Sequence, residues 1–422
     1  MVSTRNRQII SLIKKNLIFF ALSKGVAFLA PLLFVNYVSL EDYGLIEFSY
    51  STGTVMAGVL MLGLGGAYPY FILKRQDEDK RQSFFLYGFL ILLLFALFAP
   101  LFYGGQISDS VYFVFLFTAI FALQRLYSTI LKSHDKGHLA VLYDGGYYFV
   151  LATVIIVAIL FKATQPVLSL RIGMEFYLLA LIILFICKFI ESQTKNIKEL
   201  ICKDYPHILK YSVHLIISGF IIFWLTSNSK IYIKYLLGYE QVGIYSFYFR
   251  MAGISIIIHT FCYITFFKKL YLSNPAKLDK YYFILLSIVF ICCVICYFIA
   301  PSLMKMLSIN TITQTHNKLF LLLCFQMPIW VGIALNEGIV ARENIVKYSN
   351  LYLGIFTAIF PVVLYFLRDI ITLELFTIMS ILLFGISYFT QMQLLKKRGV
   401  VFRKCQIFNV MSVIIAIIIY FI

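Results

Sequence analysis

The chain has 422 residues, of which 61% are hydrophobic and only 13% are charged, and its formal net charge is +17. A soluble globular domain carries about a quarter charged residues, because its surface faces water. So few charged residues cannot cover the surface of a soluble protein of this size. The composition therefore excludes a soluble protein and predicts an all-α polytopic membrane protein.

Thirteen apolar stretches follow one another along the chain, each close to the ~20 residues that a helix needs to cross a bilayer. They cover residues 16–38, 44–70, 83–103, 111–131, 139–160, 172–190, 211–235, 243–266, 282–304, 318–340, 345–367, 371–395 and 405–422. Helices satisfy their own backbone hydrogen bonds in lipid, and the short charged loops disfavour a β-barrel. Two interpretations of the last stretch stay open: a thirteenth span, or an accessory helix against the bundle.

The positive charge is distributed asymmetrically between the two sets of loops. Most of the 36 Lys and Arg residues lie on the side of the N-terminus, and the opposite loops carry only Lys162, Arg171, Lys305, Lys318 and Arg368. Because Lys and Arg concentrate in cytoplasmic loops, the N-terminus is predicted to be cytoplasmic, in a bacterial inner membrane. Basic loops beside anionic membrane lipids account for the net charge without a nucleic-acid partner.

Neither a metal site nor a cofactor is expected from the eight cysteines. Most of them lie inside apolar stretches, and Cys293 and Cys296 have no His or carboxylate beside them. Such cysteines act as small apolar packing residues. The loops opposite the N-terminus are short, which disfavours an enzyme such as a membrane glycan polymerase or ligase, because catalytic groups of that kind need a sizeable loop or domain.

Two segments match at an offset of 199 residues, close to half the chain: Glu41-Asp42-Tyr43-Gly44-Leu45-Ile46 and Glu240-Gln241-Val242-Gly243-Ile244-Tyr245. An offset of six spans returns the chain to the same side, so the halves are predicted to be parallel repeats. The glycine of each match is expected to give a tight turn its freedom in φ. We predict two six-helix bundles, residues 1–200 and 201–400, around a central cavity, with 401–422 as an extra segment.

Five cationic side chains inside the spans are candidates for substrate binding, because ionisable groups in lipid are costly and usually face a cavity. Lys24, Arg125 and Arg250 lie deepest, and Lys230 and Lys234 share one helix face near the outer end. A cationic cavity attracts anionic substrates, and a guanidinium pairs phosphate oxygens in a bidentate manner. Snorkelling of Lys230 and Lys234 to the headgroups is the alternative for that pair.

Three acidic residues inside the spans, Glu47, Asp144 and Glu337, are candidates for coupling to a cation. Asp144 lies beside Gly145-Gly146. The alternative for all three is a structural one, in which each forms an internal salt bridge with one of the buried cations. Coupling to a proton and coupling to sodium both stay open.

Several segments resemble the Wzx-type polysaccharide flippases of the MOP (multidrug/oligosaccharidyl-lipid/polysaccharide) exporter superfamily. They are Lys14-Lys15-Asn16, Ser39-Leu40-Glu41-Asp42-Tyr43-Gly44, Tyr235-Leu236-Leu237-Gly238 and Val242-Gly243-Ile244-Tyr245-Ser246. Relatives often carry Asp-Arg ahead of the last segments, where this chain has Ser229-Lys230.

The resemblance implies an alternating-access flippase for O-antigen, lipopolysaccharide or other surface polysaccharide. Its substrate would be an undecaprenyl-diphosphate-linked oligosaccharide, moved to the periplasmic leaflet, and its partners would be polysaccharide assembly proteins. A cation-coupled multidrug antiporter of the same architecture is the second hypothesis. That function would favour an acidic cavity.

Overall fold

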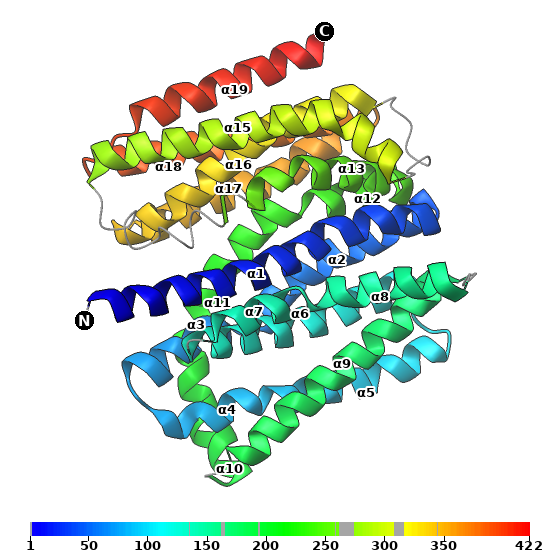
Figure 1. The fold of residues 1–422 in the computed structure, drawn as a ribbon, viewed down its shortest axis with the longest axis vertical. Helices are drawn as coiled ribbons and strands as arrows, with labels where there is room; N and C mark the ends of the chain where they lie inside the picture. The colour runs from blue at the N-terminus through cyan, green and yellow to red at the C-terminus, as the bar shows by residue number, and fades with distance from the viewer. Residues whose placement is uncertain are drawn as a thin grey trace. The chain divides into compact units, whose positions relative to one another are not determined.

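A computed structural model describes residues 2–134, 136–161, 165–192, 195–257, 259–260, 274–307, 316–343 and 345–422. Within these ranges all the regular structure is helical, as the sequence predicts (Figure 1). The chain forms two compact units, Met1–Asn228 and Ser229–Ile422.

The N-terminal unit is organised around one buried helix, α6, which packs against α2, α7 and α9. Its elements are α1 (Val2–Phe34), η1 (Val35–Tyr37), α2 (Leu40–Leu60), α3 (Leu64–Tyr68), η2 (Pro69–Lys74), η3 (Glu78–Lys80), α4 (Arg81–Phe85), α5 (Tyr87–Tyr103), α6 (Asp109–Ser133), α7 (Gly137–Asp144), α8 (Gly146–Phe161), α9 (Pro166–Glu191), α10 (Ile197–Glu199), η4 (Leu200–Asp204) and α11 (Tyr205–Ser227). The last of these, α11, packs against α2 and α3.

The C-terminal unit is also organised around one buried helix, α16, which packs against α13, α15, α18 and α19. Its elements are α12 (Ser229–Leu237), α13 (Tyr239–Ala252), α15 (Pro275–Met306), α16 (Asn317–Arg342), α17 (Val346–Phe366), α18 (Leu373–Lys396) and α19 (Arg403–Phe421). Among the described helices that could span a membrane, α6 and α16 are the most buried of their units. They correspond to the fourth and tenth predicted spans.

Nine helices in the described part of the chain are long and apolar enough to cross a membrane, or up to eleven when two bent pairs are counted as spans. The bent pairs are α2 with α3 and η2, and α7 with α8, and they match the predicted spans 44–70 and 139–160. The predicted span 211–235 is interrupted at Asn228, between α11 and α12. The predicted span 243–266 runs beyond the described residues. The chain is therefore a multi-pass membrane protein.

The glycines of the two matching segments do not form the predicted turns. Gly44 and Gly243 are buried inside α2 and α13, each as the fifth residue of its helix. The chain breaks earlier, at Ser39, whose hydroxyl oxygen accepts a hydrogen bond from the N–H of Asp42 (3.0 Å) and caps α2. In the second unit the break is at Gly238, which has a φ of +90°. The prediction was wrong because the match marks the start of a helix rather than the turn before it.

Gly63 marks a real break, between α2 and α3, where the chain bends by 46°. Its φ is +70°, a left-handed conformation that favours glycine. A Cβ added there would lie 2.7 Å from both the Cβ and the carbonyl oxygen of Ser212 in α11. Gly63 therefore serves two purposes: it allows the bend, and it lets α11 pack closely against the end of α2.

Replacing Gly63 by Ala is expected to lower the free energy of unfolding by about 2–5 kcal/mol, because left-handed strain adds to overpacking against α11. Gly105→Ala is the matched control. Gly105 also has a positive φ, of +74°, but nothing lies within 4 Å of an added Cβ, so only the strain of about 1–2 kcal/mol remains. Melting temperatures of the purified proteins in detergent measure the difference. Equal losses in the two variants would contradict a tight contact at Gly63.

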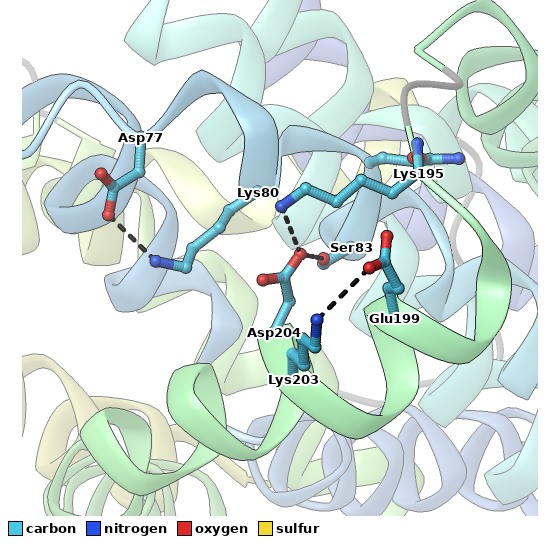
Figure 2. Close-up of polar contacts among 8 residues, drawn as sticks. Asp77, Lys80, Ser83, Lys195, Glu199, Lys203 and Asp204 are labelled. Atoms are coloured by element: carbon cyan, nitrogen blue, oxygen red, sulfur yellow. Dashed lines mark hydrogen bonds and ion pairs between the residues drawn. The ribbon is translucent and has the colours of Figure 1, made fainter.

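A polar network joins the segment before α11 to the start of α4 (Figure 2). Asp204 is buried, and its carboxylate accepts hydrogen bonds from Lys195 Nζ (3.1 Å) and the Ser83 hydroxyl (3.3 Å). The side-chain oxygen of Gln82 accepts a further bond from the backbone N–H of Lys195 (3.2 Å). Because Asp204 directly precedes α11, this network fixes the point at which that helix begins.

The final helix, α19, packs against α15, α16 and α18, and it also has the length and composition of a span. Its first turn is capped from another helix. Asp279, near the start of α15, is buried, and its carboxylate accepts hydrogen bonds from the backbone N–H groups of Lys404 and Cys405, both at 3.1 Å. A carboxylate is favourable there because it satisfies unpaired N–H groups at the positive end of the helix dipole.

Candidate functional site

A polar cavity of about 360 Å³ lies inside the N-terminal unit. Three cationic side chains and one carboxylate line it: Lys24 from α1, Arg125 and Lys132 from α6, and Asp144 from α7. Arg125 and Lys24 are half-buried. The structure thus brings together three residues that the sequence singled out separately, namely Lys24, Arg125 and Asp144.

The helix α6 supplies five of the ten residues that line the cavity, Gln124 among them. Phe121, Arg125, Thr129 and Lys132 are spaced by four, four and three residues, so they fall on one helix face. Arg125 Nη1 donates a hydrogen bond to the backbone carbonyl oxygen of Thr54 in α2, at 3.2 Å. This bond holds the guanidinium between α2 and α6.

Asp144 enters the cavity because a helix breaks directly after it. α7 ends at Asp144, Gly145 is the cap, and α8 leaves at an angle of 53°. The Asp144 carboxylate pairs with Lys132 Nζ at 3.0 Å. A carboxylate at a helix C-terminus is disfavoured by the helix dipole, and the lysine offsets this cost. The predicted ion pair thus exists, but its cation is Lys132 rather than Lys24 or Arg125.

Part of the lining of the cavity is aromatic. The Tyr148 hydroxyl donates to the Tyr50 hydroxyl at 2.8 Å, and the Tyr50 ring packs edge-on against Phe117 and Phe121, with centroids 5.6 and 5.1 Å away. Rings packed on several sides lose little further freedom when a ligand binds, and their hydroxyls supply polar contacts. The cavity therefore combines fixed aromatic walls with a net positive charge.

Comparison with known proteins gives structural matches only. No family model matches the chain, and no curated protein sequence matches it. An inward-facing multidrug resistance MATE family transporter of the MOP superfamily superposes with a TM-score of 0.55, over 88% of this chain and 93% of the other. An outward-facing MATE transporter gives 0.50 over 95% and 96%, and each is 14% identical to this chain. The chain has the MATE transporter fold.

The MATE fold agrees with the predicted fold class, an all-α polytopic membrane protein. It does not separate a polysaccharide flippase from a multidrug transporter, because at 14% identity the likeness concerns the fold alone. The choice between these two functions therefore depends on the residues of the cavity.

The other predicted site residues do not line the cavity. Lys230 is buried in α12, which argues against snorkelling, and Lys234 Nζ lies 3.9 Å from the ring centroid of Tyr235. Arg250 is half-buried in α13. The acidic candidates Glu47 and Glu337 lie in α2 and α16, where Glu47 is fully buried and Glu337 half-buried.

Sequence reasoning missed Lys132, because it lies one residue beyond the predicted span 111–131, whereas α6 continues to Ser133. The signal that identifies it is its spacing of seven residues from Arg125, which is two helical turns along one face. Gln124, Tyr50 and Tyr148 were missed too, because neutral polar and aromatic residues are common throughout the chain.

Proposed function

We propose that this chain is a flippase for oligosaccharides linked to polyprenyl diphosphate, and that Lys24 and Arg125 bind the diphosphate in the N-terminal cavity. The supporting observation is the charge of that cavity. Lys132 is paired with Asp144 at 3.0 Å, so the lining keeps two cations in excess of its carboxylate. Cations in a cleft with low-dielectric walls raise the local concentration of anions.

The dimensions of the cavity suit the charged part of such a substrate. Ligand pockets usually measure roughly 300–1,000 Å³, and this one, at about 360 Å³, is near the lower limit. It holds a diphosphate and the adjoining sugar rather than a complete oligosaccharide. The guanidinium of Arg125 matches two phosphate oxygens, and the ammonium of Lys24 adds a point charge. The polyprenyl tail would stay in the lipid.

Transport by alternating access, from the cytoplasmic to the periplasmic leaflet of an inner membrane, belongs to the same proposal. It rests on the MATE fold and on the excess of Lys and Arg on the N-terminal side of the spans. Lys230, Lys234 and Arg250 are proposed as further substrate contacts from the C-terminal unit. Polysaccharide assembly proteins are the expected partners.

A cation-coupled multidrug antiporter is the second candidate, because the Asp144 carboxylate lies in the same cavity. An acidic group there can bind a cationic drug or a coupling proton or sodium ion, as Glu47 and Glu337 can elsewhere in the chain. The excess of cations beside Asp144 favours the first candidate. The fold similarity gives no support to the third hypothesis, a glycan polymerase or ligase.

Reconstitution into liposomes separates the two candidates. The vesicles contain a polyprenyl-diphosphate-linked oligosaccharide in both leaflets, and a glycan-modifying enzyme that cannot cross the membrane is added outside. We expect the protein to make the inner pool accessible, while protein-free vesicles leave it protected. If the protein does not make the inner pool accessible but drives uptake of a cationic dye in a cation gradient, the antiporter hypothesis is supported instead of the flippase hypothesis.

A further inference from the structure

A second pocket, of about 270 Å³, lies in the N-terminal unit on the opposite face of α6. Tyr127, Ile130, Leu131 and His134 line it, and none of these residues lines the first cavity. Helical spacing places them on the side of α6 away from Arg125. The two pockets are therefore separate sites.

The second pocket lies where three helical segments end or begin together. Arg81 opens α4, His134 follows the last residue of α6, and Lys188, Glu191 and Ser192 lie at the end of α9. All three helices belong to candidate spans, so the pocket is at the boundary of the membrane rather than at its centre. At this level the phosphate groups of the lipids are the most abundant anions.

Three hydrogen-bond donors in the pocket have no partner among the described residues: the Arg81 guanidinium, the Lys136 ammonium and the Tyr127 hydroxyl. Lys188 is engaged with Glu191, with 2.5 Å between Nζ and Oε2. Glu191 is the only acidic residue among those that line the pocket. The lining thus has more cationic than anionic groups, and some of its donors are unoccupied.

Helix stability does not account for Arg81. Cations are favourable at the C-terminal ends of helices, which explains Lys188, but they are disfavoured at the N-terminal ends. Arg81 is the first residue of α4, and its side chain is half-buried beside the pocket. Arg81 therefore places a cationic donor beside the pocket. The guanidinium pairs best with a planar or tetrahedral oxyanion.

The apolar lining residues of the pocket are more buried than the charged ones. Phe85, Ile130 and Leu131 are buried, whereas Arg81 and Lys188 are half-buried and Lys136 and Glu191 are exposed. A ligand with a phosphate joined to a hydrophobic part satisfies both regions. We propose that this pocket binds a phosphate group at Arg81, Lys136 and Tyr127, of the kind carried by an anionic phospholipid headgroup or by free phosphate, and that Glu191 opposes its binding by neutralising Lys188.

Two variants of the full-length protein test the site, one expected to weaken lipid binding and the other to strengthen it. Misfolding could weaken binding but could not strengthen it. The double variant Arg81→Gln/Lys136→Gln removes two phosphate donors, and we expect phosphatidylglycerol binding to weaken about tenfold. Glu191→Gln releases Lys188, and binding should become about threefold tighter. Native mass spectrometry in detergent measures the apparent Kd, with phosphatidylcholine as the uncharged reference.

Matched controls change the same charges outside the pocket. Lys198→Gln/Lys277→Gln removes two exposed cations, and Glu199→Gln frees Lys203 from its exposed ion pair. Both should bind phosphatidylglycerol within about twofold of the wild type. If the pocket variants bind phosphatidylglycerol as these controls do, the proposed phosphate site is wrong.

A competition experiment with inorganic phosphate distinguishes the two sources of the ligand. If millimolar phosphate displaces the lipid from the wild type but not from Arg81→Gln/Lys136→Gln, the pocket recognises the phosphate group itself. If phosphate has no effect and the lipid still discriminates between the variants, the pocket recognises the phospholipid. Phosphatidylcholine and phosphatidylglycerol binding equally well, with no response to phosphate, would contradict the proposal.

Discussion

Arg125→Gln is expected to slow transport of the lipid-linked oligosaccharide by about 10- to 100-fold. The substitution removes a charge-assisted contact with the diphosphate, and each 1.4 kcal/mol of lost binding corresponds to a factor of ten. The amide of glutamine can still donate to the Thr54 carbonyl oxygen, so the packing between α2 and α6 is largely retained. The accessibility assay in liposomes measures the rate.

Arg171→Gln is the matched control for this experiment. Arg171 also lies in a helix of the N-terminal unit, but it pairs with Asp109 at 3.7 Å, stacks on Phe102 and does not line the cavity. It should transport at a rate close to that of the wild type. Arg125→Lys keeps the charge without the planar fork, so an intermediate rate is expected. Normal transport by Arg125→Gln would remove the basis of the diphosphate site.

Asp204→Ala is expected to destabilise the protein by about 2–4 kcal/mol. The carboxylate is buried, and its loss leaves Lys195 and the Ser83 hydroxyl without their acceptor near the start of α11. The cost is less than that of a fully buried pair because the side chain of Lys195 is 26% exposed. The apparent melting temperature in detergent should fall by several degrees.

The neighbouring pair Glu199–Lys203 provides the control for Asp204 (Figure 2). Its two side chains are 50% and 75% exposed, so Glu199→Ala should change the stability by less than about 1 kcal/mol. Asp204→Asn retains an acceptor for Ser83 and should fall between the two. If Asp204→Ala is no less stable than Glu199→Ala, the network does not anchor α11.

The helical fold was predictable because lipid imposes a simple rule: long apolar stretches must be helices. The breaks inside those stretches were harder to locate. Gly63 and Gly145 look like ordinary glycines in an apolar sequence, yet both lie at bends, of 46° and 53°. A bend is decided by what packs against it, as Ser212 does at Gly63, and that contact joins residues 149 positions apart.

The candidate site also combines features that the sequence indicates with features that it does not. Lys24, Arg125 and Asp144 could be selected singly, because each is a charge in an apolar stretch. Their meeting in one cavity depends on how α1, α6 and α7 pack, which no local pattern contains. The sequence also could not predict which unit α11 packs in. The predicted repeat boundary after residue 200 assigns α11 to the second half, whereas the helix packs within the N-terminal unit.

The placement of the two pockets on opposite faces of α6 has a thermodynamic consequence. A small roll or tilt of this one helix alters both linings together, since Arg125 and Lys132 move with Tyr127 and His134. If a ligand in either pocket favours one orientation of α6, the lipid composition of the membrane affects the affinity for the substrate. By reciprocity, each ligand then changes the other's Kd by the same factor.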